Sequence, residues 1–189
     1  MKALILVGSK DPAGRTAKAV KALIEGIKDG GGTAEPVWLT ERDIRMCDQC
    51  NADGWGECLK KGTCHHRDDF AGLVGKIRKA DVAVFATRVY WSDWAERLQA
   101  FVNRKRRICV NKEGRKGIAD KPAVAVCVAG GGGGGSYESA QHLVTALGHC
   151  GMDVLDAIPA RRQNLDLKLE VLKATGRWLA ARGREAGKT

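Results

Sequence analysis

The chain lacks the long apolar runs that mark membrane and exported proteins. Its longest stretch without charge, Pro122 to Tyr137, contains six consecutive glycines and is too short and too flexible for a transmembrane helix. The apolar run near the N-terminus, Ala3 to Val7, is shorter than the core of a signal peptide. We therefore expect a cytoplasmic protein with no membrane span, in which the seven cysteines do not form a disulfide framework.

Aromatic residues are also scarce: they make up 5% of the chain, and five of the ten are tryptophan. Hydrophobic residues make up 44% and charged residues 29%, which is the composition of a globular protein and not of a disordered one. A chain of 189 residues falls within the size of one domain and buries a substantial core. We therefore predict a single domain over residues 1–182, with a cysteine-rich insert at 40–67, followed by a polar tail over 183–189.

Basic residues outnumber acidic ones, so the chain carries a net charge of +10. Residues 104–121 contain eight basic and two acidic residues and alone contribute +6. Such a stretch implies an anionic partner, which would be a phosphorylated cofactor, an acidic protein or nucleic acid, or it is simply a solvated helix end and loop. A site for single-stranded nucleic acid needs exposed aromatics, and this stretch contains none, so we rank nucleic acid last.

Short apolar runs alternate with helical periodicity along the chain. The runs that predict buried strands are 2–8, 33–39, 81–87, 122–128 and 152–158. Apolar residues at helical spacing follow them and predict helices that begin near Thr16, Asp68, Trp94, Tyr137 and Leu165. Strands that alternate with helices form a parallel sheet with helices on both faces, so we predict a three-layer α/β fold.

The loops after the first, third and fourth strands are the expected place of function. Ligands of an open parallel sheet bind at the carboxyl ends of its strands. The loops concerned are 9–16, 88–94 and 130–136.

The first of these loops has the chemistry of an anion site. It differs from a nucleoside triphosphate loop, because five residues separate its glycines and Arg15 stands where that motif has lysine. A terminal monophosphate needs only hydroxyls, backbone amides and charge, which are supplied by Ser9, Gly14, Arg15 and Thr16. The alternative is a plain turn in which Thr16 caps the following helix.

The other two loops carry features that suit a flat ligand. Tyr90 and Trp91 are adjacent aromatics, which are costly to expose unless they cover something planar. Trp94 is instead expected to pack against its own helix. The six glycines of 130–135 lose much conformational entropy on folding. A reason for this cost would be a ligand that the backbone must approach closely. The alternative is a flexible loop.

Several motifs occur in the order in which one flavoprotein family carries them. They are Met1-Lys-Ala-Leu-Ile-Leu-Val-Gly-Ser, Gly14-Arg-Thr-Ala, Gly62-Thr-Cys-His-His-Arg-Asp-Asp-Phe, Ala86-Thr-Arg-Val-Tyr-Trp-Ser, Leu98-Gln-Ala-Phe-Val-Asn-Arg and Ala129-Gly-Gly. Over residues 1 to about 180 the chain resembles the NAD(P)H-dependent FMN reductase family, nearest the branch of the iron–sulfur flavoproteins. The resemblance implies a flavodoxin-like α/β/α sandwich whose five-stranded parallel sheet has the order 2-1-3-4-5, with FMN as the cofactor.

The resemblance also implies which residues bind FMN. Those at the phosphate would be Ser9, Lys10, Gly14, Arg15 and Thr16. One side of the isoalloxazine ring would be lined by Val89, Tyr90, Trp91 and Ser92, and its pyrimidine edge would be approached by Gly130, Gly131, Gly132 and Gly133. Arg88 departs from the family, which usually has proline there, and its cation would either shift the aromatic loop or lie near the N1/O2 edge of the flavin.

Four of the seven cysteines lie within eighteen residues, at Cys47, Cys50, Cys58 and Cys64. Four thiolates at this density are able to hold a [4Fe–4S] cluster or a zinc ion. The iron–sulfur flavoproteins have two residues between the second and third cysteines, whereas this chain has seven. A [4Fe–4S] cluster and unmetallated thiols therefore stay open as equal alternatives, ahead of zinc.

The remaining cysteines and the neighbouring histidines have less specific patterns. His65 and His66 are expected to be solvated loop residues, although either has the chemistry to replace a cysteine ligand. Three further cysteines stand alone in the sequence and are expected to act as small hydrophobes: Cys109, Cys127 and Cys150.

The preferred hypothesis is an FMN-dependent NAD(P)H oxidoreductase that passes electrons through the flavin to a quinone, another small acceptor or an iron–sulfur centre. Because the flavin carries the chemistry, no catalytic side chain is predicted. The basic stretch at 104–121 is a candidate to attract the phosphates of the nicotinamide cofactor. The alternative is a non-enzymatic, flavodoxin-like electron carrier. The resemblance favours a homodimer or homotetramer with the flavin near an interface.

Overall fold

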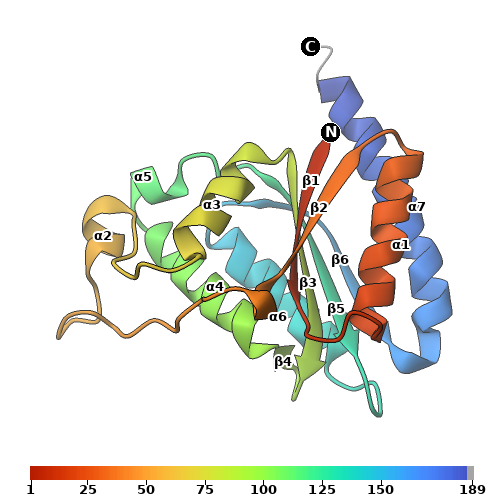
Figure 1. Ribbon diagram of the computed structural model, residues 1–189, viewed down its shortest axis with the longest axis horizontal. Helices are drawn as coiled ribbons and strands as arrows, with labels where there is room; N and C mark the ends of the chain where they lie inside the picture. The colour runs from red at the N-terminus through yellow and green to blue at the C-terminus, as the bar shows by residue number, and fades with distance from the viewer. Residues whose placement is uncertain (187–189) are drawn as a thin grey trace.

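A parallel sheet forms the centre of the computed structural model (Figure 1), which describes the backbone of residues 1–186 and the side chains of residues 1–182. Its strands lie in the order β2-β1-β3-β5-β6. They are β1 (Lys2–Gly8), β2 (Thr33–Trp38), β3 (Val82–Tyr90), β5 (Pro122–Ala129) and β6 (Asp153–Arg161). The predicted fold and strand order are therefore confirmed. A short strand that the sequence did not predict, β4 (Asp93–Trp94), pairs with β3 in the antiparallel direction.

Two helical layers cover the sheet (Figure 1). On one face lie α1 (Arg15–Asp29) and α7 (Leu165–Ala186), and on the other lie α3 (Phe70–Lys79), α4 (Glu96–Ile108) and α6 (Ser136–Gly148). Shorter elements in the connections are η1 (Leu39–Glu41), α2 (Glu57–Lys61), α5 (Lys112–Arg115) and η2 (Arg162–Asn164). The last helix continues to Ala186, past the expected start of a polar tail at 183, and residues 187–189 of that tail lie outside the described residues.

The central strands are buried on both faces, which explains their continuous apolar runs. In β1, Ala3, Ile5 and Val7 pack in the layer of α1 and α7. Leu4 and Leu6, which alternate with them, pack in the layer of α3, α4 and α6. Because successive side chains of a strand point to opposite faces, one apolar run serves both cores. Within the described residues, no helix is long and apolar enough to cross a membrane.

The basic stretch at 104–121 is solvated only in part: Arg106, Lys112, Arg115 and Lys116 are exposed, whereas other basic residues of the stretch pack into the fold. Arg104 and Lys105 are buried, with Lys105 Nζ 3.2 Å from Met152 Sδ. Arg115 donates to the carbonyl of His149, and Lys121 donates to that of Ala80. These contacts lie at the amino ends of the strands, away from the edge where ligands of such folds bind. These basic side chains therefore serve the fold and are not placed to attract the nicotinamide cofactor.

A buried ion pair attaches the cysteine-rich insert to α4. Arg104 donates from its two terminal nitrogens to the two carboxylate oxygens of Asp68, at 2.5 and 3.0 Å, and the side chains are 1% and 0% exposed. Arg104 also donates to the carbonyl of Arg45 and to Cys64 Sγ, at 3.1 and 3.2 Å. Asp68 accepts the backbone N–H groups of Arg45 and Phe70, at 3.0 and 3.2 Å. The pair thus holds both ends of the insert and the first residue of α3.

We expect Arg104→Met to lower the free energy of unfolding by about 3–5 kcal/mol, because it leaves a buried carboxylate without its partner. Urea unfolding at neutral pH measures this loss. Arg106→Met removes an exposed arginine two residues further along the same helix and serves as the control. It should change stability by less than about 0.5 kcal/mol.

The pH dependence of the same pair provides an internal check. Burial alone would raise the pKa of Asp68, but hydrogen bonds from Arg104 and from the N–H groups of Arg45 and Phe70 outweigh burial and lower this pKa to about 2, from 3.8. The wild-type protein therefore loses stability as the pH falls from about 4 toward about 2. In Arg104→Met, burial is less opposed and the pKa of Asp68 rises, so protonation relieves the variant. The difference in stability between the two proteins should shrink toward pH 3, and a constant difference would contradict this account.

Candidate functional site

A polar pocket of about 110 Å³ lies where β1, β3 and β5 end. Because these strands are adjacent and parallel, their carboxyl ends share one edge of the sheet. The pocket is lined by the loop after β1, the start of α1, the ends of β3 and β5, and the residue after β5. These lining residues are Ser9, Asp11, Gly14, Arg15, Thr16, Arg88, Val128 and Gly130. The structure thus brings together most of the residues that the sequence assigned to a phosphate.

The pocket is suited to an anion. It lies at the N-terminus of the 15-residue helix α1, whose first turn contains no acidic residue. Arg15 and Arg88 bring two guanidinium groups, and the hydroxyl-bearing residues Ser9 and Thr16 are buried at 4% and 3% exposure. Asp11 brings the one carboxylate among these lining residues, and its Oδ1 accepts the N–H of Ala13 at 2.9 Å. The side chains therefore leave an excess of positive charge for a ligand.

Three of the predicted details differ in the structure. The residue at the N-cap of α1 is Gly14 and not Thr16, so the Thr16 side chain is not used as a cap. Lys10 is exposed and is not among the residues that line the pocket. Arg88 lies in the wall of the anion pocket together with Arg15, whereas the sequence suggested a place near the N1/O2 edge of the flavin. Its guanidinium is 4.3 Å from the ring centre of Tyr90.

A tight turn presents the aromatic residues. Val89 pairs with Trp94 and Tyr90 with Asp93, so Trp91 and Ser92 form a two-residue hairpin turn. Both have positive φ, at 49° and 64°, a conformation that is strained for a bulky side chain. The Trp91 side chain is fully exposed, whereas Trp94 is buried and donates from its indole nitrogen to the carbonyl of Ser139 at 2.9 Å. Strain combined with an exposed indole indicates a functional surface.

The glycine loop packs against this turn. Its backbone is held by a bond from the N–H of Gly133 to the carbonyl of Gly130, at 2.7 Å, and by one from Gln163 to the carbonyl of Gly132, at 2.9 Å. A Cβ on Gly135 would lie 2.7 Å from Ser92 Cα, so a larger residue there would collide with the aromatic turn. At Gly131 and Gly132 a Cβ would meet open space. The loops after β1, β3 and β5 therefore converge, and open space remains beside the glycine backbone.

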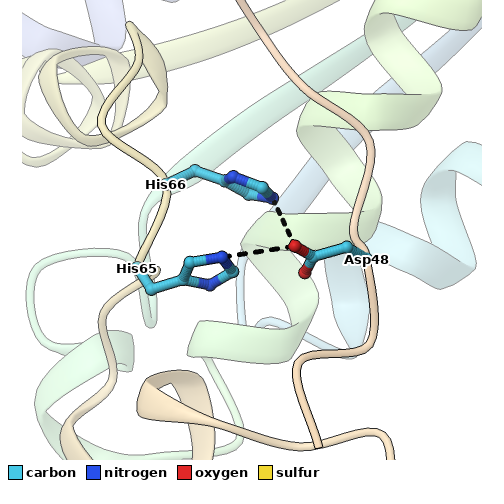
Figure 2. A group of neighbouring side chains, drawn as sticks. All are labelled: Asp48, His65 and His66. Atoms are coloured by element: carbon cyan, nitrogen blue, oxygen red, sulfur yellow. Dashed lines mark ion pairs between the residues drawn. The ribbon is translucent and has the colours of Figure 1, made fainter.

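The four clustered cysteines line one small cavity of about 10 Å³. Cys50 Sγ lies 3.1 Å from Nδ1 of His65, and Cys64 Sγ accepts a hydrogen bond from Arg104. Asp48 faces both His65 and His66 from a separate segment, and all three line the same cavity (Figure 2). His66, expected to be solvated, is only 10% exposed in its side chain. Sequence spacing favoured the cysteines as ligands and did not reveal this group of three.

The cavity fits neither of the two groups that four cysteines would hold, a [4Fe–4S] cluster or a zinc ion. Its volume is close to that of one water-sized sphere, which is too small for the eight atoms of a [4Fe–4S] cluster. Four thiolates bound to zinc at about 2.3 Å lie about 3.8 Å from one another. Among the described residues, no three cysteine sulfurs lie within 4.8 Å of one another. Metal binding by Cys47, Cys50, Cys58 and Cys64 therefore stays a prediction, and we derive no chemistry from it.

The other three cysteines are buried, but two of them are not isolated. Burial raises the pKa of Cys127 to about 12. A hydrogen bond with Cys150 and burial raise the pKa of Cys109 far above the ordinary value of a thiol. That bond, with the nearby charge of Lys105, lowers the pKa of Cys150 to about 6 despite its burial. These residues lie 41 positions apart, so nothing in their spacing predicted the pair.

Curated relatives of the chain are iron–sulfur flavoproteins. One from Archaeoglobus fulgidus is 29% identical over 104 residues, which cover 55% of this chain and 45% of the relative. One from Methanocaldococcus jannaschii is 24% identical over 194 aligned positions, which cover 95% of this chain and 96% of the relative. The first alignment thus spans less than half of that relative, whereas the second spans both proteins.

Solved structures share the fold. The NAD(P)H:quinone oxidoreductase from Methanothermobacter marburgensis has a TM-score of 0.67 at 21% identity, with 95% of this chain and 96% of that chain covered. A flavodoxin, WrbA-like protein from Agrobacterium tumefaciens has a TM-score of 0.63 at 16% identity, with 97% and 98% covered. The family model for NADPH-dependent FMN reductase matches residues 1–163. The chain therefore belongs to the NADPH-dependent FMN reductase family of flavin oxidoreductases.

Proposed function

We propose that this chain binds FMN in the pocket at the carboxyl edge of its sheet and oxidises NAD(P)H, passing the electrons to a small acceptor such as a quinone. The observation that carries the proposal is the convergence of three loops on one place. The loop after β1 supplies an anion pocket, the turn after β3 supplies exposed aromatics, and the loop after β5 supplies open backbone. FMN has a phosphate at one end and a planar ring at the other, which suits this arrangement.

The phosphate end is supported by charge and burial. Arg15 and Arg88 face the same pocket, and the backbone amides at the start of α1 face an anion as they do at other helix N-termini. Charge-assisted bonds of this kind are about twice as strong as neutral ones. Asp11 limits the excess positive charge, which favours a monophosphate over the more highly charged phosphates of a nucleoside triphosphate.

The ring end is supported by the hairpin turn and the glycine loop. Tyr90 is 39% exposed and Trp91 is fully exposed, so both offer apolar surface to a flat ligand. The open positions at Gly131 and Gly132 leave their backbone accessible to the edge of a ring. When bound there, FMN supplies the hydride and electron transfer, while the side chains orient it and limit its contact with water.

A quinone or another small aromatic acceptor fits an open, aromatic site better than a polar substrate does. The similar structure from Methanothermobacter marburgensis carries the name of a quinone oxidoreductase, which supports this choice. The alternative function is electron carriage without catalysis. The two differ in one property: a carrier does not oxidise NAD(P)H by itself.

We expect the purified protein to bind FMN, and we expect Arg15→Met to weaken this binding by about 10–100-fold, because one charged hydrogen-bond partner contributes about 1.5–3 kcal/mol. Riboflavin, which lacks the phosphate, should bind both proteins equally. Titration of the apoprotein with each flavin, followed by fluorescence, measures the four dissociation constants.

Lys10→Met is the matched control for this titration. Lys10 lies in the same loop but outside the pocket lining, so its removal should change FMN affinity by less than about threefold. Absence of FMN uptake by the wild-type protein, or an equal loss of riboflavin affinity in Arg15→Met, would rule out the phosphate site.

Replacing Trp91 separates the backbone strain at this residue from its proposed contact with the flavin ring. Asparagine tolerates positive φ, so Trp91→Asn should raise the stability of the apoprotein by about 0.5–1 kcal/mol. The same change should weaken FMN binding several-fold, because the ring loses a flat cover. Urea unfolding and FMN titration of one preparation measure both effects. If the variant is less stable and binds FMN normally, Trp91 has no role at the ring.

The FMN-loaded protein should oxidise NAD(P)H continuously when a quinone is present, and the rate should fall in Arg15→Met in proportion to the lost FMN. The absorbance of the nicotinamide cofactor follows this reaction directly. Reduction of bound FMN by dithionite but not by NADPH or NADH would instead support the electron carrier.

A further inference from the structure

The cysteine-rich insert contains a group of side chains with the geometry of a single-ion site. Asp48 Oδ2 lies 3.3 Å from Nε2 of His65 and 3.5 Å from Nε2 of His66 (Figure 2). Together, the three residues offer ligand atoms that all lie within 4.8 Å of one another. Two nitrogens and one oxygen, converging from two separate segments of the insert, form a ligand set that divalent transition metals accept.

The distances agree with shared coordination better than with hydrogen bonding. Nitrogen and oxygen ligands lie about 2.0–2.1 Å from zinc, so two of them on a tetrahedral ion are about 3.3–3.4 Å apart. The gap of 3.5 Å between His66 and Asp48 is longer than a normal N–H···O bond. Nε2 of His66 makes no hydrogen bond although its side chain is nine-tenths buried. A buried nitrogen without a partner is costly, and an ion would satisfy it.

The second nitrogen of His65 supports the same assignment. Cys50 Sγ lies 3.1 Å from Nδ1 of His65 and 3.6 Å from Asp48 Oδ1, which allows the thiol to donate to Asp48 and to accept from Nδ1–H. In that tautomer Nε2 of His65 carries a lone pair and faces the carboxylate oxygen of Asp48. In that tautomer, a cation between the two acceptors satisfies both. A hydrogen bond to the remote nitrogen is the usual way in which a ligating histidine is oriented.

The surroundings leave room for one ion, and the half-exposed side chains of His65 and Asp48 leave one side of it open to water. The cavity of about 10 Å³ has the size of about one water molecule. The positive charge of Arg104 in its wall is balanced by Asp68. Arg107 is the second arginine that lines the cavity. Its guanidinium is engaged elsewhere, because it stacks 4.2 Å from the ring of Trp55 and donates to the carbonyl of Gly54.

We propose that Asp48, His65 and His66 bind one divalent transition-metal ion of the zinc class, with a fourth position open to water, in place of a cluster held by the four cysteines. The ion would join the segment that carries Asp48 to the one that carries both histidines, and so would close the insert on itself. This inference does not depend on FMN binding, because none of the three residues lines the pocket at the carboxyl edge of the sheet.

Zinc binding to the full-length protein as purified tests the proposal. Calorimetric titration with Zn²⁺ should show one ion per chain. Asp48→Asn changes an exposed side chain and should fold normally, and His66→Ala removes the buried nitrogen; each should weaken zinc binding by at least about 100-fold. X-ray absorption at the zinc edge should show nitrogen and oxygen ligands near 2.0–2.1 Å and no sulfur near 2.3 Å.

Two control variants distinguish this site from its competitors. The chain has four histidines, and the double variant His142→Ala/His149→Ala removes the two that lie on and beside α6, so it should bind zinc as the wild type does. Cys47→Ser should also retain binding, whereas a four-cysteine site would lose it. The proposal fails if zinc does not bind stoichiometrically, if a sulfur shell appears, or if anaerobic reconstitution loads four irons and four sulfides that depend on Cys47.

Discussion

Parallel register is the constraint on which the pocket depends. β1 pairs with β3 so that Gly8 is opposite Thr87, and β3 pairs with β5 so that Val89 is opposite Ala129. The ends of the three strands are aligned to within a few residues in the register, so the three loops that follow them lie at one edge of the sheet. Gly8 allows α4 to approach this edge, because a Cβ there would lie 2.9 Å from Leu98 Cβ. The anion pocket, the aromatic turn and the glycine loop converge because the strands beneath them are in register.

The insert obeys a different constraint, which acts through α4. Arg97 donates to the carbonyl of Ile44, and Arg104 holds Asp68 together with the carbonyl of Arg45, so one helix face fixes the path of the insert. A buried pair of this kind contributes less to net stability than to the choice of one arrangement, because desolvation offsets most of its attraction. Its importance is therefore positional: it decides where the cysteines, Asp48 and the two histidines lie.

Sequence patterns predicted those parts of the protein that depend on local periodicity. The buried strands β1, β3 and β5 are recognisable because burial on both faces requires continuous apolar runs. The pocket loops are recognisable because strand ends in such folds share an edge. In contrast, Lys105 is basic yet buried beneath Met152, and Cys109 and Cys150 meet across 41 positions. Such contacts depend on tertiary packing, which composition and spacing do not encode. The short strand β4 was missed because two residues carry no periodicity.

The two functional regions share α4 but not their ligand-binding residues. Near the start of the helix, Thr87 Oγ1 accepts the N–H of Ala95 at 3.1 Å, which ties this end to β3 and to the aromatic turn. Arg104 and Arg107, which contact the insert beside the cysteine cavity, are about two to three turns further along. A change in the insert can reach the anion pocket through this helix, whose Leu98, Phe101 and Val102 are fully buried. The other contact is at the first residue of the insert, where Thr40 Oγ1 donates to the carbonyl of Ser9 at 3.4 Å. Densely packed cores resist movement of the helix. Loss of a metal from the insert should therefore leave FMN affinity nearly unchanged, so the two sites can be tested independently.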